Sequence, residues 1–182
     1  MTYSINWKGL DENQTLEHCT LNINNRGVDV QSTIEGFINN IPFNAGYRII
    51  TDSNWRTTGF AINYQSNGIP YKLSYTGDAN GNWLKDGIEQ PLLTGCIEID
   101  ITATPFTNAL AINRLRLAIG ESGTIKVLYV DTTENTVTAT EQIYTRVDNY
   151  IYHFATSNFK AEIQFDEMGF VVEYPGLFTR VK

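Results

Sequence analysis

The chain has 182 residues, of which 42% are hydrophobic and 18% charged, and its formal net charge is −7. A chain of this length suits one domain and can bury roughly two-thirds of its unfolded surface, which argues against disorder. Its 13 Lys and Arg residues form no run, so a phosphate backbone is excluded as a ligand and an anionic bilayer is disfavoured. We therefore expect a single domain over residues 1–182, with no nucleic-acid partner.

The amino-terminal segment gives no sign of export. Met1–Gly9 lacks a basic start followed by an apolar run, and no stretch approaches the ~20 apolar residues that span a bilayer. Cys19 and Cys96 are expected to be reduced and buried, as is usual inside the cell. We expect a cytoplasmic protein without stable membrane insertion, and the sequence leaves the oligomeric state open.

Apolar and polar residues alternate along most of the chain, which is the period of strands with one buried face. Asn67-Gly68 accepts the positive φ angles of a type I′ hairpin turn, and Asp166–Gly169 forms the last turn. Long consecutive strands with short turns predict an all-β fold: one large curved antiparallel sheet, as a half-barrel or open barrel meander. In chain order, the expected strands cover residues 17–23, 28–34, 47–51, 55–65, 71–75, 97–101, 124–131, 137–147, 150–156, 159–166 and 170–174.

One segment, Thr104–Leu115, breaks this alternation. Thr104 is suited to cap a short helix that has a proline at its first position. Phe106, Leu110 and Ile112 would then point toward the sheet. We expect a short helix that plugs the curved sheet.

Residues suited to catalysis are sparse. His18 and His153 are isolated within strand patterns, and Cys19 would lie on the face opposite its neighbour His18, which excludes a dyad. Glu98 and Asp100 share a strand face about 7 Å apart, a workable separation for glycoside hydrolysis. An ordinary strand with one solvent-exposed face would also place Glu98 and Asp100 in this way, and it explains the pattern equally well. We expect no catalytic residue, no metal ligand and no cofactor.

Two arginines lie among aromatic or apolar neighbours. Arg56 follows Trp55, and Arg114 lies in an apolar stretch. An arginine near a sheet interior needs a carboxylate partner, for example Asp52 or Asp100, or an anionic ligand. The structural ion pair is favoured over the ligand role.

The Thr104–Leu115 segment resembles the hallmark of a bacterial family described as putative glycolipid-binding, whose motif runs Thr-Pro-x-Thr-Asn-Thr-Leu-Pro-Ile-Arg-Arg-Leu. The chain departs from that motif at Ala109, Ala111 and Asn113, where the family has Thr, Pro and Arg. The missing arginine weakens a paired-arginine site for an acidic head group and leaves Arg114 alone. Further similar stretches follow in order along essentially the whole chain, at Trp7, Leu16–His18, Asp52, Trp55-Arg56, Leu93–Asp100, Gln142–Tyr144, Gly169–Val171 and Tyr174–Phe178.

The resemblance implies a curved sheet similar to that of lipoprotein and glycolipid carriers. We expect non-catalytic binding of a glycolipid or other lipid-like small molecule on a concave face lined by Tyr, Phe and Trp. Two alternatives stay open: a hydrolase that cleaves a sugar-lipid through Glu98 and Asp100, and a protein-interaction scaffold that uses a sheet edge or an aromatic patch. The candidate ligand-binding residues are Trp55, Arg56, Asn108, Arg114, Gln142 and Tyr144.

Overall fold

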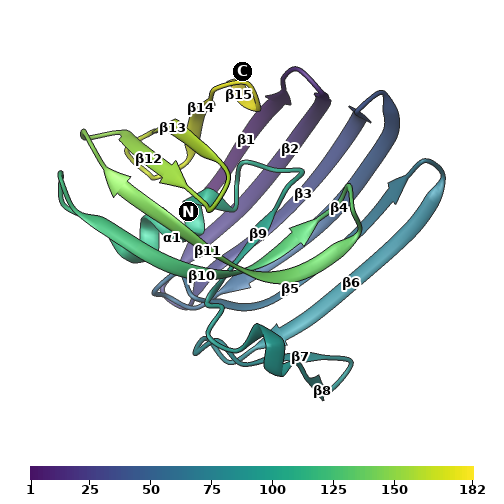
Figure 1. Ribbon diagram of the computed structural model, residues 1–182, viewed down its shortest axis with the longest axis horizontal. Coiled ribbons are helices and arrows are strands. Elements are labelled where there is room, and N and C mark those ends of the chain that lie inside the picture. The colour runs from purple at the N-terminus through teal and green to yellow at the C-terminus, as the bar shows by residue number, and fades with distance from the viewer.

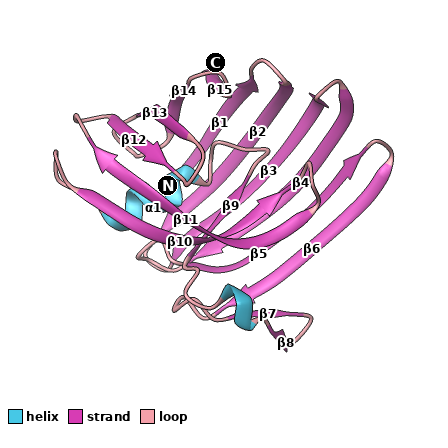
Figure 2. Cartoon of the chain, viewed as in Figure 1, coloured by secondary structure: helices cyan, strands magenta, loops and turns pink.

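The computed structural model describes residues 1–182, and it consists mainly of strands (Figures 1 and 2). Strands account for 61% of the residues and helices for 6%, which confirms the all-β prediction. The helical parts are α1 (Asn108–Leu115) and the 3-10 turn η1 (Pro91–Leu93), and neither is long enough to cross a membrane. The strands are β1 (Thr2–Gly9), β2 (Asn13–Asn24), β3 (Gly27–Ile38), β4 (Ile41–Thr51), β5 (Thr57–Ser66), β6 (Ile69–Gly77), β7 (Trp83–Lys85), β8 (Ile88–Glu89), β9 (Glu98–Ile101), β10 (Ser122–Asp131), β11 (Thr136–Arg146), β12 (Ile151–Ala155), β13 (Lys160–Phe165), β14 (Val171–Tyr174) and β15 (Phe178–Val181).

All these strands belong to one sheet, in which most strands pair with their neighbours in the chain and β1 pairs with β15. The order is β8-β7-β6-β5-β4-β3-β2-β1-β15-β14-β13-β12-β11-β10-β9, so β8 and β9 are the two free edges and the sheet does not close into a barrel. Every pair is antiparallel except β9 with β10, which are parallel, and this corrects the expectation of a purely antiparallel sheet. Parallel neighbours require a crossover connection, and α1 lies in it.

The sheet is rolled, so that β9–β11 lie against the inner face of the long strands β3–β6 (Figure 1). Ile99, Ile101, Leu128 and Val130, on one face of β9 and β10, belong to the same core cluster as the buried inward residues of β1–β6. The other face of β10, which carries Val127, belongs to a second cluster with β12–β15 and part of α1. Both faces of β9 and β10 are therefore covered by other parts of the protein.

The helix α1 begins later than predicted. Its N-cap is Thr107, three residues after Thr104. The Thr104 hydroxyl accepts the backbone N–H of Phe106 at 3.0 Å and donates to Glu17 at 2.9 Å, so it forms a separate turn before the helix. The expected orientation of the apolar residues is confirmed, since Phe106 and Leu110 are fully buried.

Trp55 lies in a turn and not in the strand predicted to include it. Its φ is 64°, and β5 begins two residues later. The cause is the carboxylate of Asp52, whose Oδ1 accepts the backbone N–H groups of Asn54 and Arg56 at 2.8 and 2.9 Å. Such side-chain bonds to nearby backbone groups compete with strand pairing.

The two edge regions of the roll meet where the turn after β6 contacts the loop before β9. The N–H of Gly95 donates to the carbonyl of Gly81 at 2.9 Å, and the indole N–H of Trp83 donates to the carbonyl of Cys96 at 2.7 Å. These bonds form a seam between segments that no strand pairing joins.

The substitution Gly81→Ala is expected to weaken this seam. Gly81 has a φ of +87°, and a Cβ there would lie 2.8 Å from the Cα of Gly95. Because both the strain and the overlap involve backbone, we expect the free energy of unfolding to fall by about 3 kcal/mol. In the matched control Gly87→Ala, φ is +78° and nothing lies within 4 Å, so only the strain of about 1 kcal/mol is expected. Urea unfolding measures both losses. Equal losses in the free energy of unfolding for Gly81→Ala and Gly87→Ala would contradict close packing at the seam.

Candidate ligand-binding cavity

A cavity of about 890 Å³ lies inside the roll, and its lining comes mainly from strand ends. Five hairpin turns surround it: residues 10–13 between β1 and β2, 38–39 between β3 and β4, 133 between β10 and β11, 156–159 between β12 and β13, and 176–177 between β14 and β15. The segment from Thr102 to Asn108, which leads into α1, also contributes. Its volume lies within the usual range of small-molecule sites, roughly 300–1,000 Å³.

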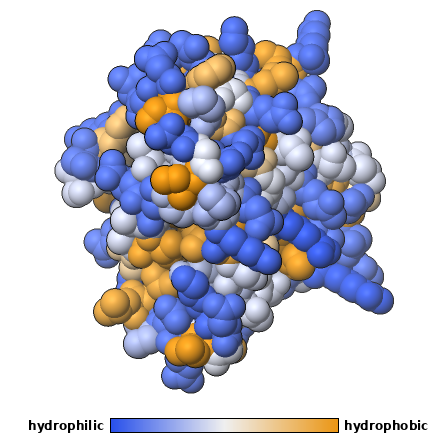
Figure 3. Space-filling view, turned by 90° about the vertical axis from the view of Figure 1, so that its right-hand side faces the viewer, coloured by the Kyte–Doolittle hydropathy of each residue, from blue (hydrophilic) through white to orange (hydrophobic).

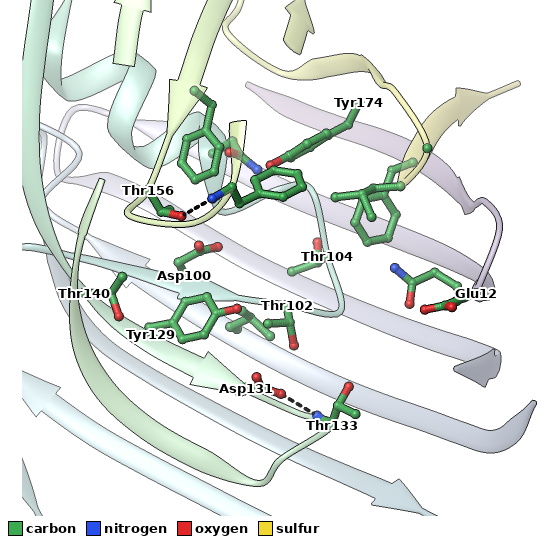
Figure 4. Close-up of a pocket in the computed structure, with 18 of the residues that line it drawn as sticks. Glu12, Asp100, Thr102, Thr104, Tyr129, Asp131, Thr133, Thr140, Thr156 and Tyr174 are labelled. Carbon is green, nitrogen blue, oxygen red and sulfur yellow. Dashed lines mark hydrogen bonds between the residues drawn. The ribbon is translucent and has the colours of Figure 1, made fainter. Parts of the chain in front are cut away.

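One side of the cavity is polar, and we call it the polar wall. Tyr129 of β10 pairs with Asp100 of β9 on one side and with Thr138 of β11 on the other, so their side chains share a face. In Figure 4, Asp100, Tyr129 and Thr140 lie along this side, with Asp131 and Thr133 at its lower end. The polar wall consists of Asp100, Tyr129, Asp131, Thr138, Thr140 and Gln142.

Four aromatic residues of β12–β15 form the aromatic wall. They are Phe154, Phe159, Tyr174 and Phe178, and neighbouring ring centroids lie 6.1–6.5 Å apart. Phe159 is 40% exposed, whereas the other three are almost fully buried. In Figure 4, Tyr174 lies at the top of the cavity and the polar wall lies below it. The cavity therefore has two sides of opposite chemical character.

Asp100 is held in place by neighbouring side chains. Its Oδ1 accepts the hydroxyl of Thr107 at 2.8 Å, and its Oδ2 accepts the amide of Gln142 at 2.6 Å. Burial raises the pKa of the Asp100 carboxyl above its ordinary value, and the two hydrogen bonds oppose this shift. The pKa of Tyr129 rises to about 12, first through burial and then through the charges of Asp100 and Asp131. Two acidic side chains, Asp100 and Asp131, therefore lie beside Tyr129 on the polar wall.

Glu98, the other carboxylate of the predicted pair, does not line the cavity. It is 1% exposed, and its Oε1 accepts a hydrogen bond from Nε of Arg114. The expected ion pair of Arg114 is thus formed with Glu98 and not with Asp100. The expectation that this face of β9 is exposed to solvent was wrong, because the rolled sheet covers it.

Three of the six candidate ligand-binding residues lie at the cavity or directly behind it. Asn108 and Gln142 line it. Tyr144 is buried behind them, and its hydroxyl donates to Oδ1 of Asn108 at 2.9 Å. Their role in binding stays a prediction.

The other three candidates, Trp55, Arg56 and Arg114, lie outside the cavity lining. Trp55 is packed in the main core, with its ring centroid 6.5 Å from that of Phe170. Arg56 contacts Asp52 through its backbone N–H and forms no ion pair with it. A direct contact of Trp55 or Arg114 with a ligand in this cavity would require a rearrangement of the core or of the Glu98 ion pair.

Sequence reasoning missed most of the cavity lining. The three tryptophans expected to be suited to a ligand surface are buried in the core, whereas threonines supply much of the lining. One signal was available in β11, where Thr138 and Thr140 alternate with Val137 and Ala139. An alternating threonine face is also typical of a solvated strand, so the signal does not identify a cavity by itself.

Apolar side chains are also exposed away from the cavity. On the face shown in Figure 3 they form separate patches in a mainly polar surface. The most exposed near the β8 edge are Leu92 at 87% and Ile88 at 68%. A role for this region in docking a protein partner stays a prediction.

Comparison with known proteins agrees with this fold. A family model described as "Putative glycolipid-binding" matches residues 4–180. A crystal structure of a DUF1089 family protein from Pseudomonas aeruginosa matches with a TM-score of 0.79 and 32% sequence identity, over 91% of this chain and 92% of that chain. None of the curated proteins compared with the chain matches it. The chain therefore belongs to the family described as putative glycolipid-binding.

Proposed function

We propose that this protein binds a glycolipid, or a similar amphipathic small molecule, between the polar wall and the aromatic wall, and that it does so without catalysis. The observation that carries the proposal is the opposite character of the two walls around one space of about 890 Å³. A ligand with hydroxyl groups and apolar faces satisfies both walls, through hydrogen bonds on one side and ring contacts on the other. The family description supports the same class of ligand.

The polar part of the ligand belongs in the cavity. Only nine of its 26 lining residues are hydrophobic, so an acyl chain alone would bury hydroxyls, amides and carboxylates without partners. Leu10, Ile38 and Leu177 are the aliphatic members of the surrounding turns and supply contacts for the lipid portion. The lipid portion is therefore proposed to leave the cavity past these turns.

The positions of the carboxylates support binding without cleavage. Hydrolysis of a glycosidic bond needs two carboxyl groups on either side of it. Glu98 is paired outside the cavity, and Asp100 and Asp131 both lie on the polar wall, so these two carboxylates do not flank a ligand from opposite sides. After prolonged incubation with the purified protein, dodecyl maltoside should be recovered intact by mass spectrometry. Sugar release that Asp100→Asn abolishes would establish the hydrolase alternative instead.

Filling the cavity is expected to abolish binding. Thr140 lies on the polar wall, and Thr140→Trp places an indole in the space proposed for the ligand. We expect the affinity for dodecyl maltoside, measured by titration calorimetry, to fall by about 30-fold or more. Thr145→Trp is the matched control, because Thr145 lies on the same strand but outside the cavity lining. Equal affinity of the two variants would place the binding site elsewhere.

A further inference from the structure

The cavity contains acidic side chains and no basic one. Asp11, Glu12, Asp100 and Asp131 line it, and none of its 26 lining residues is Lys, Arg or His. Sites that bind phosphate, sulfate or carboxylate groups usually provide Arg or Lys for charge-assisted hydrogen bonds. This cavity provides none.

Arginines of the surrounding strands are engaged elsewhere. Arg146, at the end of β11, donates to the carbonyls of Leu117 and Asn149 at 2.9 and 2.8 Å. Arg180 of β15 pairs with Asp166 at 2.7 Å. Their charges are therefore committed to the protein itself and do not neutralise the carboxylates of the cavity.

The carboxylates of the polar wall retain capacity to accept hydrogen bonds. Asp131 Oδ1 accepts the backbone N–H groups of Thr133 and Glu134 at 2.8 and 2.9 Å, and its Oδ2 has no donor from the protein (Figure 4). The threonine hydroxyls beside it can both donate and accept. A sugar supplies many hydroxyl donors on its edges and an apolar C–H face for the aromatic wall.

We infer that the group held between the two walls is a sugar that carries no negative charge, and that the cavity discriminates against anionic head groups. This inference rests on the proposed function and adds the chemical class of the head group. An uncharged sugar donates hydroxyls to Asp100 and Asp131, whereas an anionic group meets both carboxylates with no cation between them. Like charges placed together at a binding site oppose binding and provide specificity.

A matched pair of ligands tests the inference. Octyl β-glucoside and octyl β-glucuronide share the ring and the alkyl chain and differ only in a hydroxymethyl group against a carboxylate. We expect the wild-type protein to bind the glucoside more tightly by about 10-fold or more in titration calorimetry at low salt. Asp131→Asn, which keeps the acceptor for the turn N–H groups, should reduce this ratio several-fold. Asp86→Asn, in the exposed turn between β7 and β8, makes the same charge change away from the cavity and should leave the ratio unchanged.

The outcomes separate this inference from the proposed function. Equal binding of the two ligands, or tighter binding of the glucuronide, would overturn the charge discrimination and leave the cavity as a site for amphipathic ligands. A ratio that falls equally in Asp131→Asn and Asp86→Asn would also overturn it, because the preference would then reflect net charge and not the polar wall. Binding of neither ligand would overturn both proposals.

Discussion

Lowering the pH from 8 to 5 is expected to stabilise this protein, and Glu17→Gln should remove a large share of that gain. Glu17 is 2% exposed, and burial raises the pKa of its carboxyl from 4.5 to about 7, against the opposing effect of hydrogen bonds from Tyr47, Ser32 and Thr104. Between these two pKa values the folded protein binds a proton that the unfolded chain releases. The free energy of unfolding therefore falls as the pH rises through this window. Above the window, Glu17 causes no further change in stability.

The size of this effect follows from the shift and the geometry. The shift corresponds to about 3 kcal/mol of lost stability once Glu17 is ionised. Ser32, Tyr47 and Thr104 donate to Oε1 at 2.7, 2.6 and 2.9 Å, whereas Oε2 is buried without a partner. An ionised carboxylate would therefore leave one buried oxygen without a donor from the protein, which is a costly state for a buried charge.

Urea unfolding at several pH values between 5 and 8 measures this dependence. The Glu17→Gln variant should have a much flatter profile than the wild type. Glu35→Gln, at an exposed position of β3, should retain the wild-type slope. Glu98 and Asp100, whose pKa values are also raised by burial, act in the same direction and account for a residual slope. Wild-type stability that stays constant or rises between pH 5 and 7 would contradict a buried, proton-binding Glu17.

Removal of the Arg114 guanidinium is expected to destabilise the protein strongly. Glu98 is 1% exposed, its Oε1 is paired with Arg114, and its Oε2 has no partner. In Arg114→Met the carboxylate keeps its burial and loses the group that lowers its pKa, so it must either remain ionised without a partner or bind a proton. We expect a loss of about 3 kcal/mol at pH 8, because breaking a buried pair leaves an uncompensated charge. The loss should diminish at pH 5.

A second substitution separates the charge from the packing. Glu98→Gln in the Arg114→Met background removes the unpaired carboxylate and should restore at least half of the lost stability at pH 8. The measurement is urea unfolding of both single variants and the double variant. Additive losses would show that the pair has no coupling and that Arg114 contributes only through its aliphatic stem.

The sequence was sufficient to predict most strands of the sheet, because strand alternation is a local property. It did not predict β1, β7, β8 or β15. Tyr3, Ile5 and Trp7 show the same period, so β1 was predictable as well, whereas β7 and β8 have three and two residues and are too short to show one. The rolling of β9–β11 onto β3–β6 depends on contacts between distant segments. The apolar run Val127–Val130 in β10 is typical of a strand covered on both faces, but such a run does not say which distant segments cover it.

The dependence on contacts between distant segments also explains why only part of the candidate site could be predicted. Asn108 and Gln142, which line the cavity, were chosen as candidates because they lie in stretches that resemble the family. Glu98 and Asp100 were paired correctly on one strand face, yet one side chain turns to Arg114 and the other to the cavity. The position of α1 over β9 decides which carboxylate faces the cavity, and strand periodicity contains no information about that position.

The most direct test of the central claim is a crystal structure of the protein with dodecyl maltoside. We expect a sugar ring between the aromatic wall and the polar wall, with its hydroxyls within hydrogen-bonding distance of Asp100, Asp131 or Thr140 and its alkyl chain leaving past Ile38. Detergent bound only on the outer face of β2–β5 or at the β8 edge, with the cavity holding only water, would contradict the claim that this cavity is the ligand site.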